Sequence, residues 1–228
     1  PGQNLFVGAD GMGGHSSGEV ASRIAVDSLK SFYEDTNDDD AITWPYKLLK
    51  SRSFDENRLA IGVKLANRNI FETALCDARY KGMGTTIVGL VAREDHLIVG
   101  HVGDSRCYRI RDRAIELLTE DHSLLNDYKK IQPLTPEEEA NFPHKNIIVR
   151  ALGMKDAVKV DVASMKPQPG DVLLLCSDGL NGECTDDELL DLFLAHEGDL
   201  DKAVQALIES ACGHGGKDNV TVILVRYV

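Results

Sequence analysis

The sequence predicts an α+β protein in which strands and helices occupy separate stretches of the chain. Apolar, β-branched runs of strand length recur at residues 5–9, 85–92, 96–102, 107–111, 172–177 and 221–228. Three other stretches have the spacing of a helix capping box, with Ser or Thr followed three residues later by Glu, at residues 16–19, 135–138 and 185–188. With 228 residues and 43% apolar composition, the chain is long enough to form one large domain with a substantial core.

The first half of the chain combines two predicted helices with the start of a sheet. After the apolar run at residues 5–9, the first capping box predicts a helix that ends near Tyr33. Residues 55–79 carry apolar side chains at intervals of three or four, which predicts a second amphipathic helix. The runs at 85–92, 96–102 and 107–111 are separated by short polar turns, and this spacing predicts an antiparallel meander of three strands.

The second half predicts further helices around the last two strands. The capping box at Thr185 precedes one apolar stripe, and residues 200–211 have the clearest amphipathic pattern in the chain. Residues 123–150 are polar and contain a helix start at Thr135, with Pro136 at the first helical position. We expect this segment to be an excursion from the sheet, and residues 35–45 to form an acidic loop.

Charge and composition exclude several classes of protein. The net charge of −12 disfavours nucleic-acid binding because a polyanion would be repelled. No stretch approaches the roughly 20 apolar residues of a membrane span, and the start does not resemble a secretion signal. The five cysteines are scattered without a CxxC pair, which favours reduced thiols in a cytoplasmic protein. Because the first residue is Pro rather than Met, we expect the sequence to be N-terminally incomplete.

Four acidic residues follow or precede apolar strands and are candidates for a shared site. They are Asp10, Asp104, Asp178 and Asp218. Hard cations such as Mg²⁺ and Mn²⁺ prefer carboxylate, carbonyl and water oxygens, and carboxylates at strand ends can converge on one point. Gly11 would let the backbone approach such an ion, since it has no Cβ. The alternative for each acid is an ordinary turn, because Asp and Gly are common turn residues.

Seven motifs resemble those of the metal-dependent serine/threonine protein phosphatases, the PPM or type 2C family, in its bacterial branch. In chain order they are ADGMGGHSSGEVAS, GMGTT, VGDSRCYRIRD, LTEDHS, RALG, GDVLLLCSDGL and GGKDNVTVILV. The resemblance covers nearly the whole chain. It implies a four-layer α-β-β-α sandwich of two mainly antiparallel sheets flanked by helices. It also implies a single catalytic domain over residues 1–228, without its first strands, and a flap subdomain at residues 123–150.

The resemblance also implies a set of metal ligands. Asp10 resembles the carboxylate that bridges two Mn²⁺ or Mg²⁺ ions, and Gly11 the residue whose carbonyl binds one of them. Asp178 and Asp218 resemble further ligands, and Asp104 resembles the acid that, with Asp178, holds a third and weaker ion. The family also has an Arg that binds substrate phosphate and an Asp ligand upstream of this motif, and both would precede Pro1.

The implied reaction is hydrolysis of phosphoserine and phosphothreonine on proteins by a water activated between two divalent ions. His15 is the candidate general acid for the leaving alkoxide, and the alternative is a solvated histidine ahead of a helix. We expect His101 and His122 to be structural, and Thr85 and Thr86 to support the site. The implied partners are phosphoproteins and a cognate Ser/Thr kinase. Two alternatives remain: a non-catalytic phosphatase-like binding or sensory module, and a metal hydrolase that acts on a small phosphoester.

Overall fold

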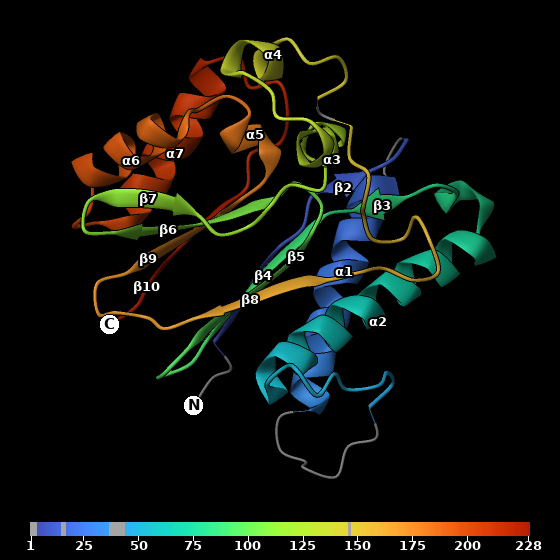
Figure 1. The fold of residues 1–228 in the computed structure, drawn as a ribbon. Helices are drawn as coiled ribbons and strands as arrows, with labels where there is room; N and C mark the ends of the chain where they lie inside the picture. Colours follow the sequence, from blue (N-terminus) through green and yellow to red (C-terminus); the bar gives the residue numbers. More distant parts are fainter. Residues whose placement is uncertain (1–3, 15–16, 37–43, 146) are drawn as a thin grey trace.

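Two four-stranded antiparallel sheets lie face to face between two groups of helices (Figure 1). These are features of a computed structural model, which describes residues 4–14, 17–36, 44–145 and 147–228. The first sheet has the strand order β1 (Leu5–Gly8), β4 (Ile87–Ala92), β5 (Leu97–Val102) and β8 (Asp161–Met165). The second has the order β10 (Val222–Arg226), β9 (Val172–Cys176), β6 (Arg106–Arg111) and β7 (Ala114–Leu117). A short third pair joins β2 (Gly11–Met12) to β3 (Gly84–Thr85).

The helices cover the outer faces of the sheets. The long helices α1 (Ser17–Asp35) and α2 (Phe54–Cys76) cover the first sheet, and the short 3₁₀ helix η1 (Ala78–Tyr80) follows them. The second sheet is covered by α5 (Asp178–Asn181), α6 (Asp186–Ala195) and α7 (Leu200–Gly213). Two further helices, α3 (Leu124–Ile131) and α4 (Pro136–Ala140), lie near the edge of the sheets, beside α5 and the β2–β3 pair (Figure 1).

Alternating side chains on the central strands explain the four layers. On β4, Ile87 and Val91 point into the cluster formed with α1 and α2, whereas Val88 and Leu90 point between the sheets. Strand β9 does the same on the other side, because Leu173 and Leu175 join the inter-sheet cluster. Strands covered on both faces are continuous apolar runs rather than alternating ones, as the sequence shows here. The predicted α-β-β-α sandwich of antiparallel sheets is confirmed.

The predicted three-stranded meander is wrong at its third strand. Strands β4 and β5 pair as expected, with Ile87 opposite Val102, but β6 pairs with β7 and β9 in the second sheet. The turn at residues 103–105 therefore carries the chain from one sheet to the other. Gly103 has a φ of 110°, a left-handed value that favours glycine, and a Cβ there would lie 2.6 Å from the Thr86 side chain.

Helix starts were predicted with mixed success. The capping boxes at Thr135 and Thr185 are both formed, at the starts of α4 and α6. The start of α2 is another capping box, Ser53 with Glu56, which the sequence analysis missed. The predicted box at residues 16–19 includes Ser16, and most of the acidic loop at 35–45 falls at 37–43; these positions lie outside the described residues. Among the described helices, none is both long and apolar enough to cross a bilayer.

Candidate functional site

Strand ends from both sheets meet along one edge of the sandwich. One narrow crevice is lined by residues at the C-terminal ends of β1 and β9, by one residue of β4 and by residues just before β6 and β10: Gly8, Ala9, Val88, Ser105, Leu175, Cys176, Ser177 and Thr221. Asp10, Asp104 and Asp178 are the direct neighbours of three of these positions, and Asp218 precedes β10 by a few residues. The fold therefore brings the four predicted acids to the same edge.

Thr86 ties the Asp10 turn to the Asp104 turn. Its Oγ1 accepts a hydrogen bond from the Asp10 backbone N–H at 3.0 Å, and its own N–H donates to the Asp10 carbonyl at 2.8 Å. The same Oγ1 lies 2.7 Å from the Ser105 Oγ, next to Asp104. Thr85 adds a hydrogen bond from its Oγ1 to the Asp10 carbonyl, at 2.8 Å. Both threonines are buried, so they hold the backbone on which Asp10 stands, as predicted.

Ser177 and Gly179 hold the Asp178 and Asp218 segments together. The Ser177 Oγ donates to the Asn219 carbonyl and accepts from the Thr221 N–H, both at 3.0 Å. A Cβ on Gly179 would lie 2.3 Å from the Asn219 carbonyl oxygen, so only glycine permits this approach. Asp218 is exposed and its Oδ1 accepts from the Asn219 N–H at 2.8 Å.

Gly11 is needed for the close packing of β2 against α1. A Cβ at this position would lie 1.9 Å from the Gly18 carbonyl oxygen, at the start of α1. Conversely, a Cβ on Gly18 would lie 2.7 Å from the Gly11 carbonyl oxygen. The two glycines therefore allow β2 to lie directly against the first turn of α1. This packing explains why glycine stands at position 11, independently of any ligand.

The four carboxylates affect one another electrostatically. The pKa of Asp10 is raised from 3.8 to about 7 by burial and by the nearby charges of Asp178, Asp218 and Asp104, with a further hydrogen bond to the Asp178 side chain. Burial and the charge of Asp178 raise the pKa of Asp104 to about 6. Burial and the charge of Asp218 also raise the pKa of Asp178. Because mutual repulsion disfavours their charged forms, a bound cation would stabilise this group.

Three of the four carboxylates line a cleft of about 540 Å³ between α5 and the α3–α4 segment. Its lining includes Asp104, Asp178 and Asp218, together with side chains of residues 123–145. Within the described ranges, however, no three His, Cys, Asp or Glu side chains form a finished metal-binding cluster. The donor chemistry fits a hard cation, since the site offers carboxylate oxygens. His15, the predicted general acid, lies outside the described residues.

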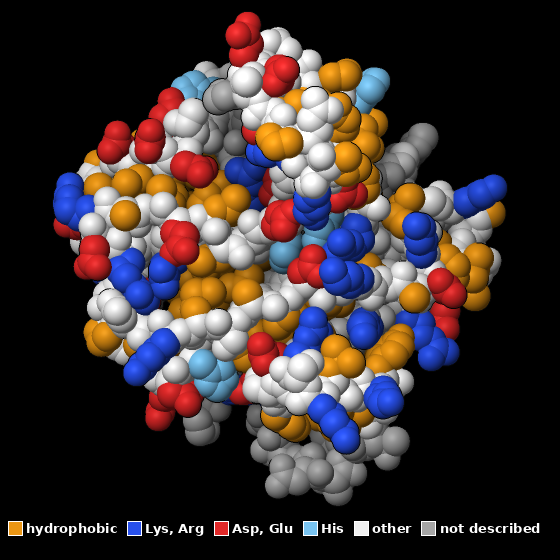
Figure 2. Space-filling view, in the orientation of Figure 1, with side chains coloured by type: hydrophobic (Ala, Val, Ile, Leu, Met, Phe, Trp, Pro, Cys, Tyr) orange, Lys and Arg blue, Asp and Glu red, His pale blue; other side chains and the backbone are white. Residues whose placement is uncertain are grey.

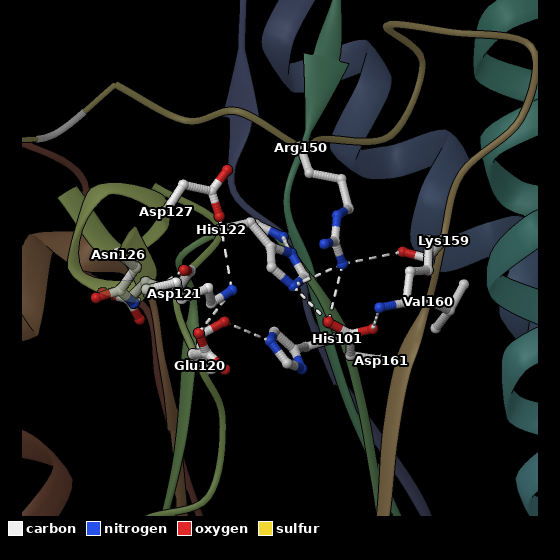
Figure 3. Close-up of polar contacts among 12 residues, drawn as sticks. His101, Glu120, Asp121, His122, Asn126, Asp127, Arg150, Lys159, Val160 and Asp161 are labelled. Atoms are coloured by element: carbon white, nitrogen blue, oxygen red, sulfur yellow. Dashed lines mark hydrogen bonds and ion pairs between the residues drawn. The ribbon is translucent and has the colours of Figure 1, made fainter. Parts of the chain in front are cut away.

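A buried polar network beneath the cleft was only partly anticipated (Figure 3). His101 and His122 stack with ring centroids 4.7 Å apart. The His122 Nδ1 accepts from the Gly103 N–H at 3.0 Å, so its Nε2 carries the proton and faces the Asp161 Oδ2 at 2.9 Å. Arg150 donates to the same carboxylate oxygen, also at 2.9 Å.

This network fixes the turn that carries Asp104. Burial lowers the pKa of His122 to about 4 and keeps the ring neutral, although its hydrogen bond to Asp161 opposes the effect. Burial would raise the pKa of Asp161, but hydrogen bonds from His122 and Arg150 outweigh it and lower that pKa. The structural role predicted for both histidines is confirmed. Asp161 was missed because no sequence motif distinguishes it from other acids at strand starts.

Arg106 is also a structural residue, as predicted. Its Nε and Nη2 bind the two carboxylate oxygens of Asp121 at 2.9 and 2.7 Å, and its Nη1 donates to the Tyr108 hydroxyl at 2.8 Å. Both charged side chains line the cleft. Because all three nitrogens of the Arg106 guanidinium group are hydrogen-bonded to these partners, the group is not positioned to bind a substrate anion.

Comparison with known proteins identifies what the chain resembles. Residues 1–217 match the family described as "Protein phosphatase 2C". The chain is 35% identical over 224 residues to the serine/threonine phosphatase stp of Listeria welshimeri, covering 98% of this chain and 84% of the relative. It is 37% identical over 226 residues to protein phosphatase PhpP of Streptococcus pneumoniae, covering 98% of this chain and 86% of the relative.

Solved structures of similar proteins share the same fold. The serine/threonine phosphatase Stp1 of Staphylococcus aureus superposes with a TM-score of 0.84 at 37% identity, covering 99% of this chain and 84% of that one. The catalytic domain of serine threonine protein phosphatase PstP, solved in complex with two manganese ions, has a TM-score of 0.80 at 31% identity. That match covers 98% of this chain and 87% of the other.

Proposed function

This chain belongs to the protein phosphatase 2C family, and we propose that it hydrolyses phosphoserine and phosphothreonine on proteins with the help of divalent cations. The observation that carries the proposal is the group of strand-end carboxylates that raise one another's pKa. Asp10 reaches a pKa of about 7 without an arginine or lysine partner in the described part of the chain. Strongly perturbed acids in a cleft are typical of functional sites.

The residues in and beside the cleft suit a pair of Mn²⁺ or Mg²⁺ ions and a third, more weakly bound ion. Asp10, the Gly11 carbonyl, Asp178 and Asp218 would hold the pair of ions, with Asp10 shared between them, and Asp104 with Asp178 would hold the third ion. The relative solved with two manganese ions supports this assignment. Bound divalent cations would lower the pKa of a water and neutralise charge on the phosphoryl oxygens.

The chain's own groups supply position and a proton. Thr86 and Ser177 fix the turns that carry Asp10, Asp104 and Asp178, so the carboxylates need little rearrangement to receive a charged ligand. We assign His15 as the general acid that protonates the leaving serine or threonine oxygen. Its place in the sequence, five residues after Asp10, supports this role.

Residues 123–150 are proposed to act as a flap that controls access to the site. The cleft lining supports this role, since it includes Ser123, Leu125 and Asn126 at the start of the segment. We further propose that residues 1–228 form one catalytic domain. The substrates would be phosphoproteins, the counterpart enzyme a Ser/Thr kinase, and the location the cytoplasm, in keeping with five free cysteines.

The proposal is tested by hydrolysis of p-nitrophenyl phosphate and of a phosphothreonine peptide, with and without Mn²⁺. We expect manganese-dependent turnover of both substrates, and its loss in Asp10→Ala and Asp178→Ala. Asp191→Ala, an exposed acid on α6, is the matched control and should retain activity.

Other outcomes of the same assays would favour a different function. Tight Mn²⁺ binding without turnover of either substrate would favour a non-catalytic binding or sensory module. Turnover of small phosphoesters but not of phosphopeptides would favour a small-molecule hydrolase. Equal activity in the presence of a chelator would contradict the metal-dependent mechanism.

A further inference from the structure

A second hollow, of about 390 Å³, lies beside the loop that connects the flap segment to β8. We call it the lysine groove. Its lining residues are Met12, Ile148, Val149, Arg150, Ala151, Met154, Lys155, Ala157, Val158 and Lys159. The lining therefore combines large apolar side chains with three cationic ones and contains no carboxylate. On this face of the molecule, Lys and Arg side chains gather among hydrophobic ones (Figure 2).

The wall of the lysine groove is a built structure. Asn67 on α2 is buried, and its Oδ1 accepts from the Gly153 N–H at 2.9 Å. The Asn67 Nδ2 donates to the carbonyls of Lys155 and Asp156 at 3.0 and 3.3 Å. Gly153 has a φ of 84°, and a Cβ there would lie 2.4 Å from the Ile70 side chain. These contacts fix the turn that presents Met154 and Lys155.

The groove shares a rigid backbone connection with the four strand-end aspartates (Asp10, Asp104, Asp178 and Asp218), which we call the acidic site. Leu152, a buried residue next to Ala151 of the lining, exchanges two backbone hydrogen bonds with Thr85, at 2.9 and 3.2 Å. Thr85 in turn donates from its Oγ1 to the Asp10 carbonyl. Met12, which lines the groove, is only two residues from Asp10. A chain lying in the groove would therefore be held at a fixed position relative to the acidic site.

The charges of the groove are only partly neutralised. Arg150 binds Asp161, and the Lys159 Nζ lies 3.4 Å from the same carboxylate. Lys155 has no ion-pair partner in the described part of the chain, and its exposed neighbour Asp156 is not in the lining. Met154 and Val149 are 54% and 42% exposed, large values for apolar side chains. A positive, apolar surface on a chain of net charge −12 is complementary to a ligand with acidic and apolar side chains.

We propose that the lysine groove binds the substrate polypeptide next to its phosphorylated residue and prefers segments that combine acidic and apolar side chains. This inference rests on the proposed phosphatase function and specifies which phosphoproteins the site would favour. An apolar side chain of the substrate packs against Met154 and Val149, while its carboxylates face Lys155 and Lys159. Docking at this surface lowers KM, but it leaves the chemistry at the acidic site unchanged.

The test compares the unmodified protein with Lys155→Glu/Lys159→Glu on two phosphothreonine peptides, one flanked by acidic and leucine residues and one by serine and glycine. We expect the double substitution to raise KM for the acidic peptide about tenfold, with kcat within twofold. KM for the serine–glycine peptide and the hydrolysis of p-nitrophenyl phosphate should stay within twofold. Lys202→Glu on α7, across both sheets from α2, is the matched charge-reversal control and should change none of these values (Figure 1). Met154→Ser should raise KM for the leucine-containing peptide only.

A binding measurement separates this inference from the catalytic one. Fluorescence anisotropy with the same acidic peptide lacking phosphate reports docking even in the absence of turnover. Weaker binding by the double variant supports the groove, whatever the catalytic result. Equal KM and equal anisotropy for the unmodified protein and the double variant would overturn the inference. So would a dimer, seen by sedimentation, that the double substitution dissociates, because a second copy would then occupy the groove.

Discussion

Two groups of aspartates in this molecule occupy similar places in the fold but have opposite electrostatic environments. One group pairs with arginines: Asp171 with Arg111, and Asp161 with Arg150. Burial alone would raise the pKa values of these two carboxyl groups, but the hydrogen bonds and charges of their partners outweigh it, so both pKa values are lowered. The other group consists of Asp10, Asp104 and Asp178, whose pKa values are raised by burial and by the charges of neighbouring aspartates, Asp218 among them.

We infer that the difference separates acids that hold the fold together from acids that bind a ligand. A carboxylate paired with arginine satisfies its hydrogen-bonding capacity within the protein and stabilises the folded state. A group of partly buried carboxylates without a cation destabilises it until a positive ligand binds. On the proposed function, the acidic site therefore reduces stability but gains affinity for a cation, whereas the arginine pairs stabilise the fold around it. Neutralising one aspartate of each group should therefore have opposite consequences for activity and for stability.

The largest expected effect is on catalysis. Asp178→Asn removes a charge from the acidic site and should lower kcat/KM for a phosphopeptide by at least about 100-fold. Asp171→Asn removes a charge of the same kind from an arginine pair and should leave kcat/KM within a few-fold. Steady-state kinetics in Mn²⁺ measure both. Similar losses of kcat/KM in the two variants would show that the two groups of aspartates do not differ in function.

For stability, we expect the opposite order: a substitution at Asp171 should cost more than one at Asp178. Asp171 is 1% exposed on its side chain and accepts hydrogen bonds from the Arg111 Nε at 2.6 Å and from the Gln168 N–H at 2.9 Å. Asp171→Ala should lower the free energy of unfolding by about 2 kcal/mol, because it leaves these donors without an acceptor. Asp178→Asn without metal should be neutral or stabilising, since it relieves repulsion. Urea unfolding measures both free energies of unfolding. A larger loss of stability in Asp178→Asn than in Asp171→Ala would contradict this expectation.

A smaller effect is expected from pH. The folded-state pKa values of Asp10 and Asp104, about 7 and about 6, lie above the ordinary value of 3.8. The folded chain therefore holds more protons than the unfolded chain in this window, and the acidic site loses stability as pH rises from about 4 to about 7. We expect the stabilisation by Mn²⁺ to be greater at about pH 7.5 than at about pH 5.

Thermal unfolding in Mn²⁺ and in chelator, at both pH values, measures this difference. Asp10→Asn is the control, and its metal-free stability should depend less on pH over the same range. Manganese stabilisation that is equal at both pH values would show that the carboxylates are not protonated in the metal-free protein.

The smallest effect is expected from an exposed ion pair. Arg68 and Glu72 form an i,i+4 pair on α2, with side chains 59% and 53% exposed. Arg68→Ala should leave the Tm nearly unchanged, because solvent screens such pairs. A drop as large as that of Asp171→Ala would mean that pairing alone, without burial, gives the arginine pairs their stability.

Some of the fold could be predicted from local patterns, and some could not. The capping boxes at Thr135 and Thr185 act within four residues, so the sequence reveals them directly. The sheet assignment of β6 could not be predicted in this way. Its apolar run follows β5 after a short turn, and only the pairing with β9, some sixty residues later, places it in the second sheet.

The candidate site shows the same limit. Asp10, Asp104, Asp178 and Asp218 could be selected because each stands at a strand end, and the fold brings them to one edge. Asp161 could not be selected, because its importance comes from contacts with His122 and Arg150, 39 and 11 residues away in the chain. The lysine groove also escaped notice, since its cations are ordinary surface residues until Asn67 fixes the turn that presents them.

On the proposed function, the strand-end carboxylates form one cation site. Crystals of the protein soaked in Mn²⁺ and measured at the manganese absorption edge test this directly. We expect anomalous peaks within ligand distance of Asp10, Asp178 and Asp218, at about 2.2 Å from carboxylate oxygens. Manganese bound elsewhere, with these three side chains left apart and free of metal, would contradict it.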